Sequence, residues 1–285
     1  DASNLRLGNF PAIFRSESGS QEIKLSSANP GPLQWLVGGY FYQFGGSAFL
    51  QPWTAPRPTA GLSGPTLEPD LGGRSFAGFA DITYEAVPGL FVNLGGRYTT
   101  EKRECSQTLN GSLVVNNVHR SFNKFNYKIG VRYEIDDKTN VYASWSTAFK
   151  SGVFNMASTR NIPVEPEEIK AAEFGLKSDP FDWFRANLAI YYYDYTNLQL
   201  QSKDSAGAGY ILQNAANAEI YGGELETTIV PTAGLKLRAA LAYTHAQYKD
   251  FPLAQGFFPQ PDGGNTVGTL DASGFVMTRA PKWSG

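Results

Sequence analysis

The chain has 285 residues, of which 18% are charged and 14% aromatic, a balance that argues against intrinsic disorder. Its net charge of −2 gives no general attraction to nucleic acid, so we expect no nucleic-acid partner. No apolar run approaches the roughly 18 residues of a membrane helix, which excludes a helical membrane protein. A membrane β-barrel stays open, because barrel strands keep polar residues on one face and mean hydropathy low, here −0.29.

Strict alternation of apolar and polar residues is the main secondary-structure signal. It is clearest in 125–136 and recurs in 90–99 and 235–244. A period of two predicts strands with one apolar and one polar face. Many of the predicted strands reach the roughly 9–11 residues that cross a bilayer on a tilt. We expect about eleven strands, near 20–28, 33–45, 74–86, 90–103, 121–135, 139–149, 167–178, 183–200, 217–230, 235–249 and 273–285.

The connections between these strands alternate between short and long. The short ones hold Pro, Gly or Asp in turn sequences, whereas the long ones are rich in Gly, Pro, Ser, Asn and Gln. Membrane barrels have short periplasmic turns and long outward loops. The sequence therefore predicts an all-β fold, an antiparallel up-and-down transmembrane β-barrel that is partial, with about eleven strands of a larger barrel. The long loops are predicted near 46–73, 104–120, 150–166, 201–216 and 250–272.

Six motifs, in order along nearly the whole chain, resemble those of TonB-dependent outer-membrane receptors. The "G-R-Y-T" strand of that family resembles 95–102, and its "Y-A-S…G-F-K-S-G" segment resembles 142–152, with Ala148 where Gly is usual. The other matching segments are 20–26 with 33–42, 165–167 with 173–177, 221–226 with 231–235, and 279–282.

The resemblance implies a receptor of the bacterial outer membrane, in contact with its lipid. The family has 22-stranded barrels with a plugged lumen, so residues 1–285 are expected to be a fragment of a single barrel domain, without the plug and C-terminal strands. The implied function is TonB-energised uptake of a scarce nutrient, most simply a ferric siderophore, with TonB acting through the absent plug domain. Other ligands, such as a glycan, cobalamin or a peptide, stay open.

Residues for catalysis or metal binding are scarce. The two histidines, His119 and His245, lie outside metal-ligand spacings, and no base is placed beside the single cysteine, Cys105. We therefore expect no enzyme activity, no catalytic residues, no metal site and no cofactor. In a different class, a soluble β-sheet module that binds carbohydrate through its aromatic residues is the alternative interpretation.

The predicted register points many charged side chains into the lumen, where they form cross-strand pairs or contact a solute. A Lys or Arg on the lipid face at mid-bilayer costs roughly 2–4 kcal/mol, so this register is favoured. Close to the outer rim, Arg97, Lys124, Tyr193 and Tyr195 are predicted to face inward. Cations and phenols suit an anionic, partly aromatic ligand, so these four are the candidate ligand-binding residues.

Overall fold

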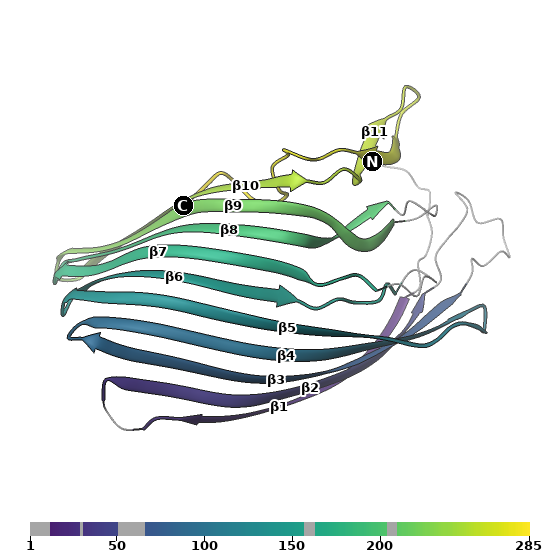
Figure 1. Ribbon diagram of the computed structural model, residues 1–285. Coiled ribbons are helices and arrows are strands. Elements are labelled where there is room, and N and C mark those ends of the chain that lie inside the picture. The colour runs from purple at the N-terminus through teal and green to yellow at the C-terminus, as the bar shows by residue number, and fades with distance from the viewer. Residues whose placement is uncertain (1–11, 29–30, 51–65, 157–162, 204–209) are drawn as a thin grey trace.

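The computed structural model describes residues 12–28, 31–50, 66–156, 163–203 and 210–285. Strands that follow one another pair antiparallel in an eleven-stranded sheet of order β1 to β10 and then β13 (Figure 1). The strands are β1 Ala12–Ser26, β2 Leu33–Leu50, β3 Leu67–Val87, β4 Leu90–Leu109, β5 Ser112–Asp136, β6 Thr139–Lys150, β7 Glu167–Phe181, β8 Phe184–Lys203, β9 Tyr210–Thr232, β10 Leu235–Asp250, β11 Ala254–Pro259, β12 Asn265–Leu270 and β13 Trp283–Ser284.

The predicted up-and-down topology is confirmed. Each of β1 to β9 is followed by an antiparallel neighbour, and β1 and β13 are the edges of the described sheet, which is open. Figure 1 shows a long twisted wall whose short turns lie together at the left, which we call the short-turn end; the opposite end is the loop end. Within the described residues no helix is long and apolar enough to cross a membrane.

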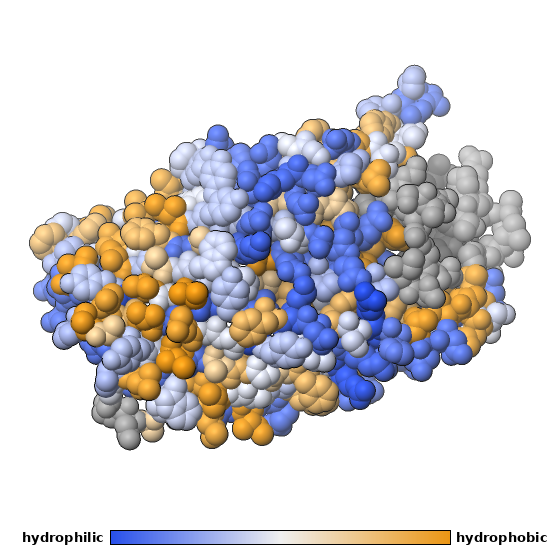
Figure 2. Space-filling model, in the orientation of Figure 1, coloured by the Kyte–Doolittle hydropathy of each residue, from blue (hydrophilic) through white to orange (hydrophobic). Residues whose placement is uncertain are grey.

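The two faces of the sheet differ in polarity. Cross-strand pairing places Trp35, Ile82, Leu94 and Ile129 in one row on four neighbouring strands, all of them well exposed. We call this apolar face the outer face and the opposite one the inner face. Figure 2 shows hydrophobic side chains gathered toward the short-turn end, with a hydrophilic band across the middle of the view. A wide, exposed apolar face matches a wall in contact with lipid.

The predicted loop at 104–120 is wrong, because β4 and β5 continue through it to Leu109 and from Ser112. Asn110 and Gly111 form the turn, with φ of 51° and 77°. Two consecutive positive φ angles are the geometry of a two-residue hairpin turn, for which Asn-Gly is the preferred pair. His119 and Cys105, expected in or at this loop, therefore lie in strands.

Two further expectations near the C-terminal end are corrected. The predicted loop 250–272 contains the hairpin β11–β12, which extends beyond the sheet in Figure 1. The predicted strand 273–285 pairs with β10 only through Trp283 and Ser284, plus one isolated bridge from Val276 to Gln247. A positive φ angle at Arg279 takes the chain out of the extended conformation between these contacts, and one at Gly274 does so before the bridge.

Buried apolar side chains gather at the loop end rather than in the middle of the sheet. One cluster lies under the β11–β12 hairpin and includes Leu198, Tyr248 and Phe251. Another packs Phe154 against Cys105 and Val115. The sheet itself is a single layer, so its core consists of loop segments folded against the inner face. These segments decide the shape of the loop end.

Candidate functional site

The inner face carries charged and aromatic side chains that largely satisfy one another. Arg132 pairs with Glu134 on the same strand, and its guanidinium carbon lies 4.2 Å from the ring centre of Phe91. Lys177 lies 5.6 Å from the ring centre of Tyr142. Such contacts hold the wall together and account for part of the charge that the sequence predicted to face inward. The remaining charges line recesses.

Arg97 lies on the inner face of β4, as predicted. Its guanidinium carbon is 5.3 Å from the ring centre of Tyr40 and 5.5 Å from that of Phe79. Its Nε donates a hydrogen bond to Thr99 Oγ1 at 3.2 Å. The ion pairs among the described residues do not include Arg97. Two rings therefore fix the direction of a guanidinium whose charge is not neutralised by a described carboxylate.

Lys124 of β5 lies opposite Thr99 of β4, on the same face as Arg97. Its ammonium forms an ion pair with the carboxylate of Glu168 on β7. The contact crosses the sheet beyond the point where β5 and β6 stop pairing, at Lys128 and Ser146. Lys124 thus connects β5 to β7, and the carboxylate of Glu168 partly compensates its charge.

Tyr193 and Tyr195 lie on the inner face of β8. Both line a recess of about 530 Å³, which we call the tyrosine recess. The Tyr193 ring stacks on Tyr191 with centres 5.0 Å apart, and Tyr195 packs against the buried cluster under the β11–β12 hairpin. The other polar residues of the recess are Tyr142, Glu173, Lys177, Asn187, Glu224 and Glu226.

The structure does not gather the four predicted residues into one cavity. Arg97 lines a shallow recess of about 460 Å³ between β3 and β6, and this recess shares no residue with the tyrosine recess. All four also lie below the loop end, because β4, β5 and β8 extend well past them. For Arg97 and Lys124 the physical reason is the Asn110–Gly111 hairpin, which extends β4 and β5 through the predicted loop.

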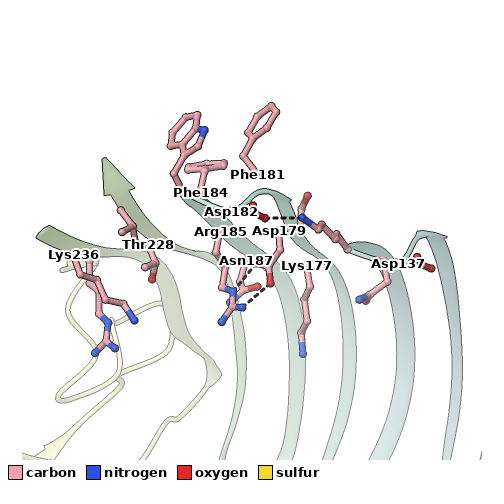
Figure 3. Close-up of a pocket in the computed structure, with 16 residues that line it drawn as sticks. Asp137, Lys177, Asp179, Phe181, Asp182, Phe184, Arg185, Asn187, Thr228 and Lys236 are labelled. Atoms are coloured by element: carbon pink, nitrogen blue, oxygen red, sulfur yellow. Dashed lines mark hydrogen bonds and ion pairs between the residues drawn. The ribbon is translucent and has the colours of Figure 1, made fainter. Parts of the chain in front are cut away.

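A second inner-face recess lies at the short-turn end and measures about 820 Å³ (Figure 3). Lys177, Arg185 and Lys236 point into it, on the side away from Phe181 and Phe184. Arg185 donates two hydrogen bonds to the carboxylate of Asp179, from Nε at 2.5 Å and from Nη2 at 2.6 Å. The recess thus contains cationic side chains from β7, β8 and β10, and the one from β8 is paired with Asp179.

The turns beside this recess carry their own ion pair. Lys138 Nζ lies 2.9 Å from Asp182 Oδ1 and joins the β5–β6 and β7–β8 turns. The hydrogen bond from Lys138 lowers the pKa of Asp182 and raises the pKa of Lys138. On the other side of the turn, Phe181 and Trp183 stack with ring centres 5.4 Å apart, both well exposed.

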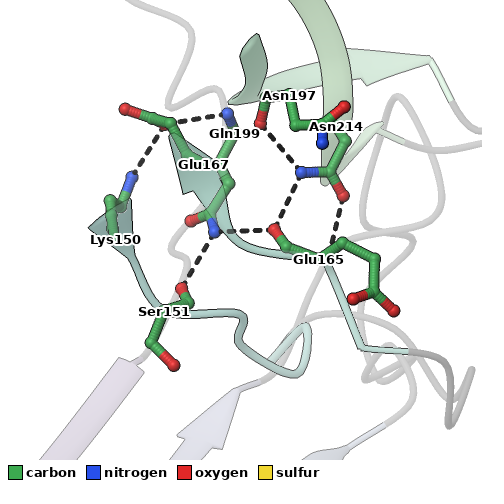
Figure 4. A network of polar contacts seen from close by, with 7 residues as sticks. All are labelled: Lys150, Ser151, Glu165, Glu167, Asn197, Gln199 and Asn214. Atoms are coloured by element: carbon green, nitrogen blue, oxygen red, sulfur yellow. Dashed lines mark hydrogen bonds and ion pairs between the residues drawn. The ribbon is translucent and has the colours of Figure 1, made fainter. Parts of the chain in front are cut away.

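At the loop end, Gln199 organises a polar network (Figure 4). Its Nε2 donates to the main-chain oxygens of Ser151 at 2.9 Å and Glu165 at 3.0 Å, and its backbone N–H donates to Glu167 Oε2 at 3.0 Å. Asn214 adds two more bonds to the main chain of Glu165. The segments before and after 157–162 are thereby tied to the inner side of β8 and β9.

A second amide clamp holds the same segment from β4. Gln107 is 1% exposed, and its Nε2 donates to the main-chain oxygen of Asn155 at 2.9 Å. The Asn155 side chain in turn exchanges two 2.8 Å bonds with the backbone of Leu212 on β9. Neither clamp is predicted by the sequence. Isolated Gln and Asn in strands carry no pattern that distinguishes a clamp from a surface amide.

Gly152 sits where this segment crosses β5. A Cβ at this position would lie 2.3 Å from the Phe122 ring and from the main-chain oxygen of Val164. Only glycine permits this approach. Among the described residues, no group of three or more His, Cys, Asp or Glu side chains is arranged to hold a metal ion.

Residues 3–285 match the family model described as TonB dependent receptor-like, beta-barrel. No curated protein matches the sequence. Among solved structures, the ferric yersiniabactin uptake receptor FyuA from Yersinia pestis is similar, with a TM-score of 0.72 and 14% identity, over 93% of this chain and 45% of that one.

The siderophore receptor PiuA from Acinetobacter baumannii is similar with a TM-score of 0.69 and 17% identity, over 95% of this chain and 43% of that one. The copper transporter OprC is similar with a TM-score of 0.64 and 16% identity, over 84% of this chain and 39% of that one. At these identities the likeness concerns the fold. The chain spans less than half the length of each of these proteins.

Proposed function

The chain belongs to the TonB-dependent receptor β-barrel family, and we propose that it forms part of the wall and outer loops of a receptor that takes up a ferric siderophore. It is a protein of the bacterial outer membrane, and its family is one of transport receptors. Residues 1–285 are proposed to be a fragment of a single barrel domain, with TonB acting through a plug domain elsewhere in the protein. The family match over residues 3–285 carries this proposal.

The inner face below the loop end supports an anionic, partly aromatic ligand. Arg97 presents an unneutralised guanidinium held between two rings, and Tyr193 presents a phenol on the same face of the sheet. Lys124 adds a cation that Glu168 compensates in part. A ligand that contacts Arg97 and Tyr193 together spans the inner face from β4 to β8. We keep Arg97, Lys124, Tyr193 and Tyr195 as the proposed ligand-contacting residues.

The family's function is transport, and we propose that the chain catalyses no reaction. The soluble carbohydrate-binding module considered above does not fit a chain that belongs to this barrel family. It also does not fit the outer face, where apolar side chains such as Leu94 and Ile129 are about half exposed and pack against no second layer.

A second candidate ligand class follows from the tyrosine recess. Glu173, Glu224 and Glu226 line it, and three carboxylates repel an anionic complex. A neutral or cationic solute, such as a metal ion with its carrier, fits that recess better than a negatively charged ferric complex.

Uptake assays with a panel of solutes test the proposal. The complete protein is expressed in a receptor-deficient, TonB-positive strain, and uptake is measured for ferric catecholate, hydroxamate and carboxylate siderophores, a copper complex, cobalamin and maltodextrin. We expect TonB-dependent uptake of one ferric siderophore. Uptake of a non-siderophore solute alone contradicts the siderophore assignment and leaves the receptor family intact.

Variants locate the binding surface. We expect Arg97→Gln to weaken binding of the transported siderophore about tenfold, the effect of losing one charge-assisted contact. Arg132→Gln is the matched control, because Arg132 also stacks on a ring but lies toward the short-turn end. Equal losses in both variants argue for a general effect on the wall and against a ligand contact at Arg97.

A further inference from the structure

The outer face has a hollow in its apolar surface across β1 to β4. It measures about 420 Å³ and is bounded by Ile23, Phe41, Phe76 and Tyr98. Its floor is a pair of glycines, Gly39 and Gly78, which are direct cross-strand partners. A Cβ at either position would meet no atom within 4 Å, so the missing side chains leave open space. This hollow, which we call the groove, therefore exists because glycine occupies both positions.

Two cations stand directly above this groove on the loop-end side. Arg74 of β3 and Lys102 of β4 are cross-strand partners, one outer-face position beyond the pair Phe76 and Thr100. Like charges placed opposite each other repel, and a pair in this position is destabilising unless a counter-charge lies nearby. Lys102 has a 2.6 Å ion pair with Glu104. Arg74 has no ion pair among the described residues.

The positive potential of this cluster extends to its acidic neighbour. The hydrogen bond from Lys102 lowers the pKa of Glu104, and the charges of Arg74 and His119 lower it further. His119 lies opposite Glu104 on β5. Glu104 pairs with Lys102, so Arg74 is the cation of this cluster that has no ion-pair partner among the described residues.

The groove and the cations lie at the level where apolar surface gives way to polar surface. Below the groove, the outer face of β3 is Ala80, Ile82 and Tyr84; above it the outer positions are Arg74 and Gly72. The rings of Phe41 and Phe76, with centres 4.8 Å apart, form the boundary. An aromatic boundary with cations just beyond it marks the outer interface of a membrane barrel.

We propose that this surface, formed by β1 to β4, binds one molecule of lipid A, the phosphorylated glycolipid of the outer leaflet. An acyl chain lies in the groove over Gly39 and Gly78. A phosphate group of the same molecule accepts hydrogen bonds from Arg74 and Lys102, which supplies the missing counter-charge. Charge complementarity with Arg74 and Lys102 calls for a phosphate joined to acyl chains, and the position of the groove toward the loop end places it in the outer leaflet, where lipid A is that lipid. The proposal does not depend on which solute the receptor transports.

The test uses the complete protein purified from outer membranes in mild detergent, and native mass spectrometry measures lipid binding. The probes are bisphosphorylated lipid A, phosphate-free lipid A and phosphatidylglycerol. We expect bisphosphorylated lipid A to bind about tenfold more tightly than either of the others. Equal binding of phosphatidylglycerol overturns the assignment to lipid A.

Two variants address the two parts of the site separately. A Cβ at Gly78 meets no atom within 4 Å, so Gly78→Leu is expected to fill the groove and to weaken lipid A binding about tenfold. The double variant Arg74→Gln with Lys102→Gln is expected to abolish the preference for the phosphorylated form. Gly78 and Arg74 are exposed and Lys102 is partly exposed. Retained resistance of the barrel to unfolding in detergent verifies the fold of both variants.

Two control variants make the same kinds of substitution at positions outside the proposed site. Ala143→Leu adds a leucine to the outer face of β6, and Lys138→Gln removes a cation at the short-turn end. Neither is expected to alter lipid A binding. If the controls weaken binding as much as the site variants do, or if the double variant keeps the phosphate preference, the proposed site is wrong.

Discussion

Gln107 Nε2 donates a 2.9 Å hydrogen bond to the main-chain oxygen of Asn155, across 48 residues of sequence. This contact joins the inner side of β4 to the segment that follows β6, and Asn155 continues it to Leu212 of β9. Strands far apart in the sheet are thus connected over the inner face.

Replacing Gln107 by Leu is expected to free the segment around Asn155. The change removes the donor and leaves the Asn155 oxygen buried without its partner, at a cost of about 1–3 kcal/mol. Limited proteolysis should cut residues 151–156 faster than in the parent protein. Gln21→Leu is the control, because Gln21 is exposed and bonds only to its neighbour Glu22. Unchanged protection in Gln107→Leu contradicts the clamp.

Gln199→Glu is expected to disrupt the network in Figure 4. The substitution replaces a donor facing two carbonyl oxygens with an acceptor, and it adds negative charge beside Glu167. Losing two hydrogen bonds costs about 1–3 kcal/mol for each buried group left unpaired. Hydrogen exchange of the Glu165 amide should become faster. The same change at exposed Gln201, on the same strand, should leave that exchange rate as it was.

Leu94→Arg is expected to destabilise the folded protein in lipid vesicles by about 2–4 kcal/mol, because Leu94 lies in the middle of the apolar outer face. Ser144→Arg is the control: it places the same side chain on the inner face, opposite Glu173. Urea titration of both variants gives the two free energies of unfolding. Similar losses at the two positions contradict the assignment of outer and inner faces.

The Cys105 thiol is expected to react slowly with iodoacetamide at pH 8. It is 2% exposed, and burial raises its pKa to about 11 from an ordinary 9.0, which lowers the thiolate fraction about 100-fold. Since the folded state holds this proton more tightly, the stability it contributes is present below pH 9 and is lost as pH rises toward 11. A rate in the folded protein equal to that of the urea-unfolded chain contradicts this prediction.

Several features of the fold could be predicted because they are local. Alternation in 125–136 determines which side chains share a face, and pairing with the neighbouring strand follows from a short turn. The Asn110–Gly111 hairpin was also readable, since Asn-Gly is the strongest short-range hairpin signal. The surrounding segment lacks strict alternation, which weakens the strand signal on both sides of this turn.

The candidate site was less predictable because it depends on contacts between distant strands. The face of Arg97 and Tyr193 follows from alternation, but their distance from the loop end depends on how far β4 and β8 extend. Whether Lys124 is neutralised depends on Glu168, 44 residues away. No short-range pattern encodes such a contact.

Side-chain alternation and turn chemistry predict most of the strands and their faces, because both act over a few residues. Contacts between distant strands fix which loop segments fold against the inner face, through Gln107 and Gln199, and which side chains neutralise each other. They also make Gly39 and Gly78 cross-strand partners, two outer-face positions below Arg74 and Lys102. Register between strands brings such residues together, and register is a property of the assembled sheet.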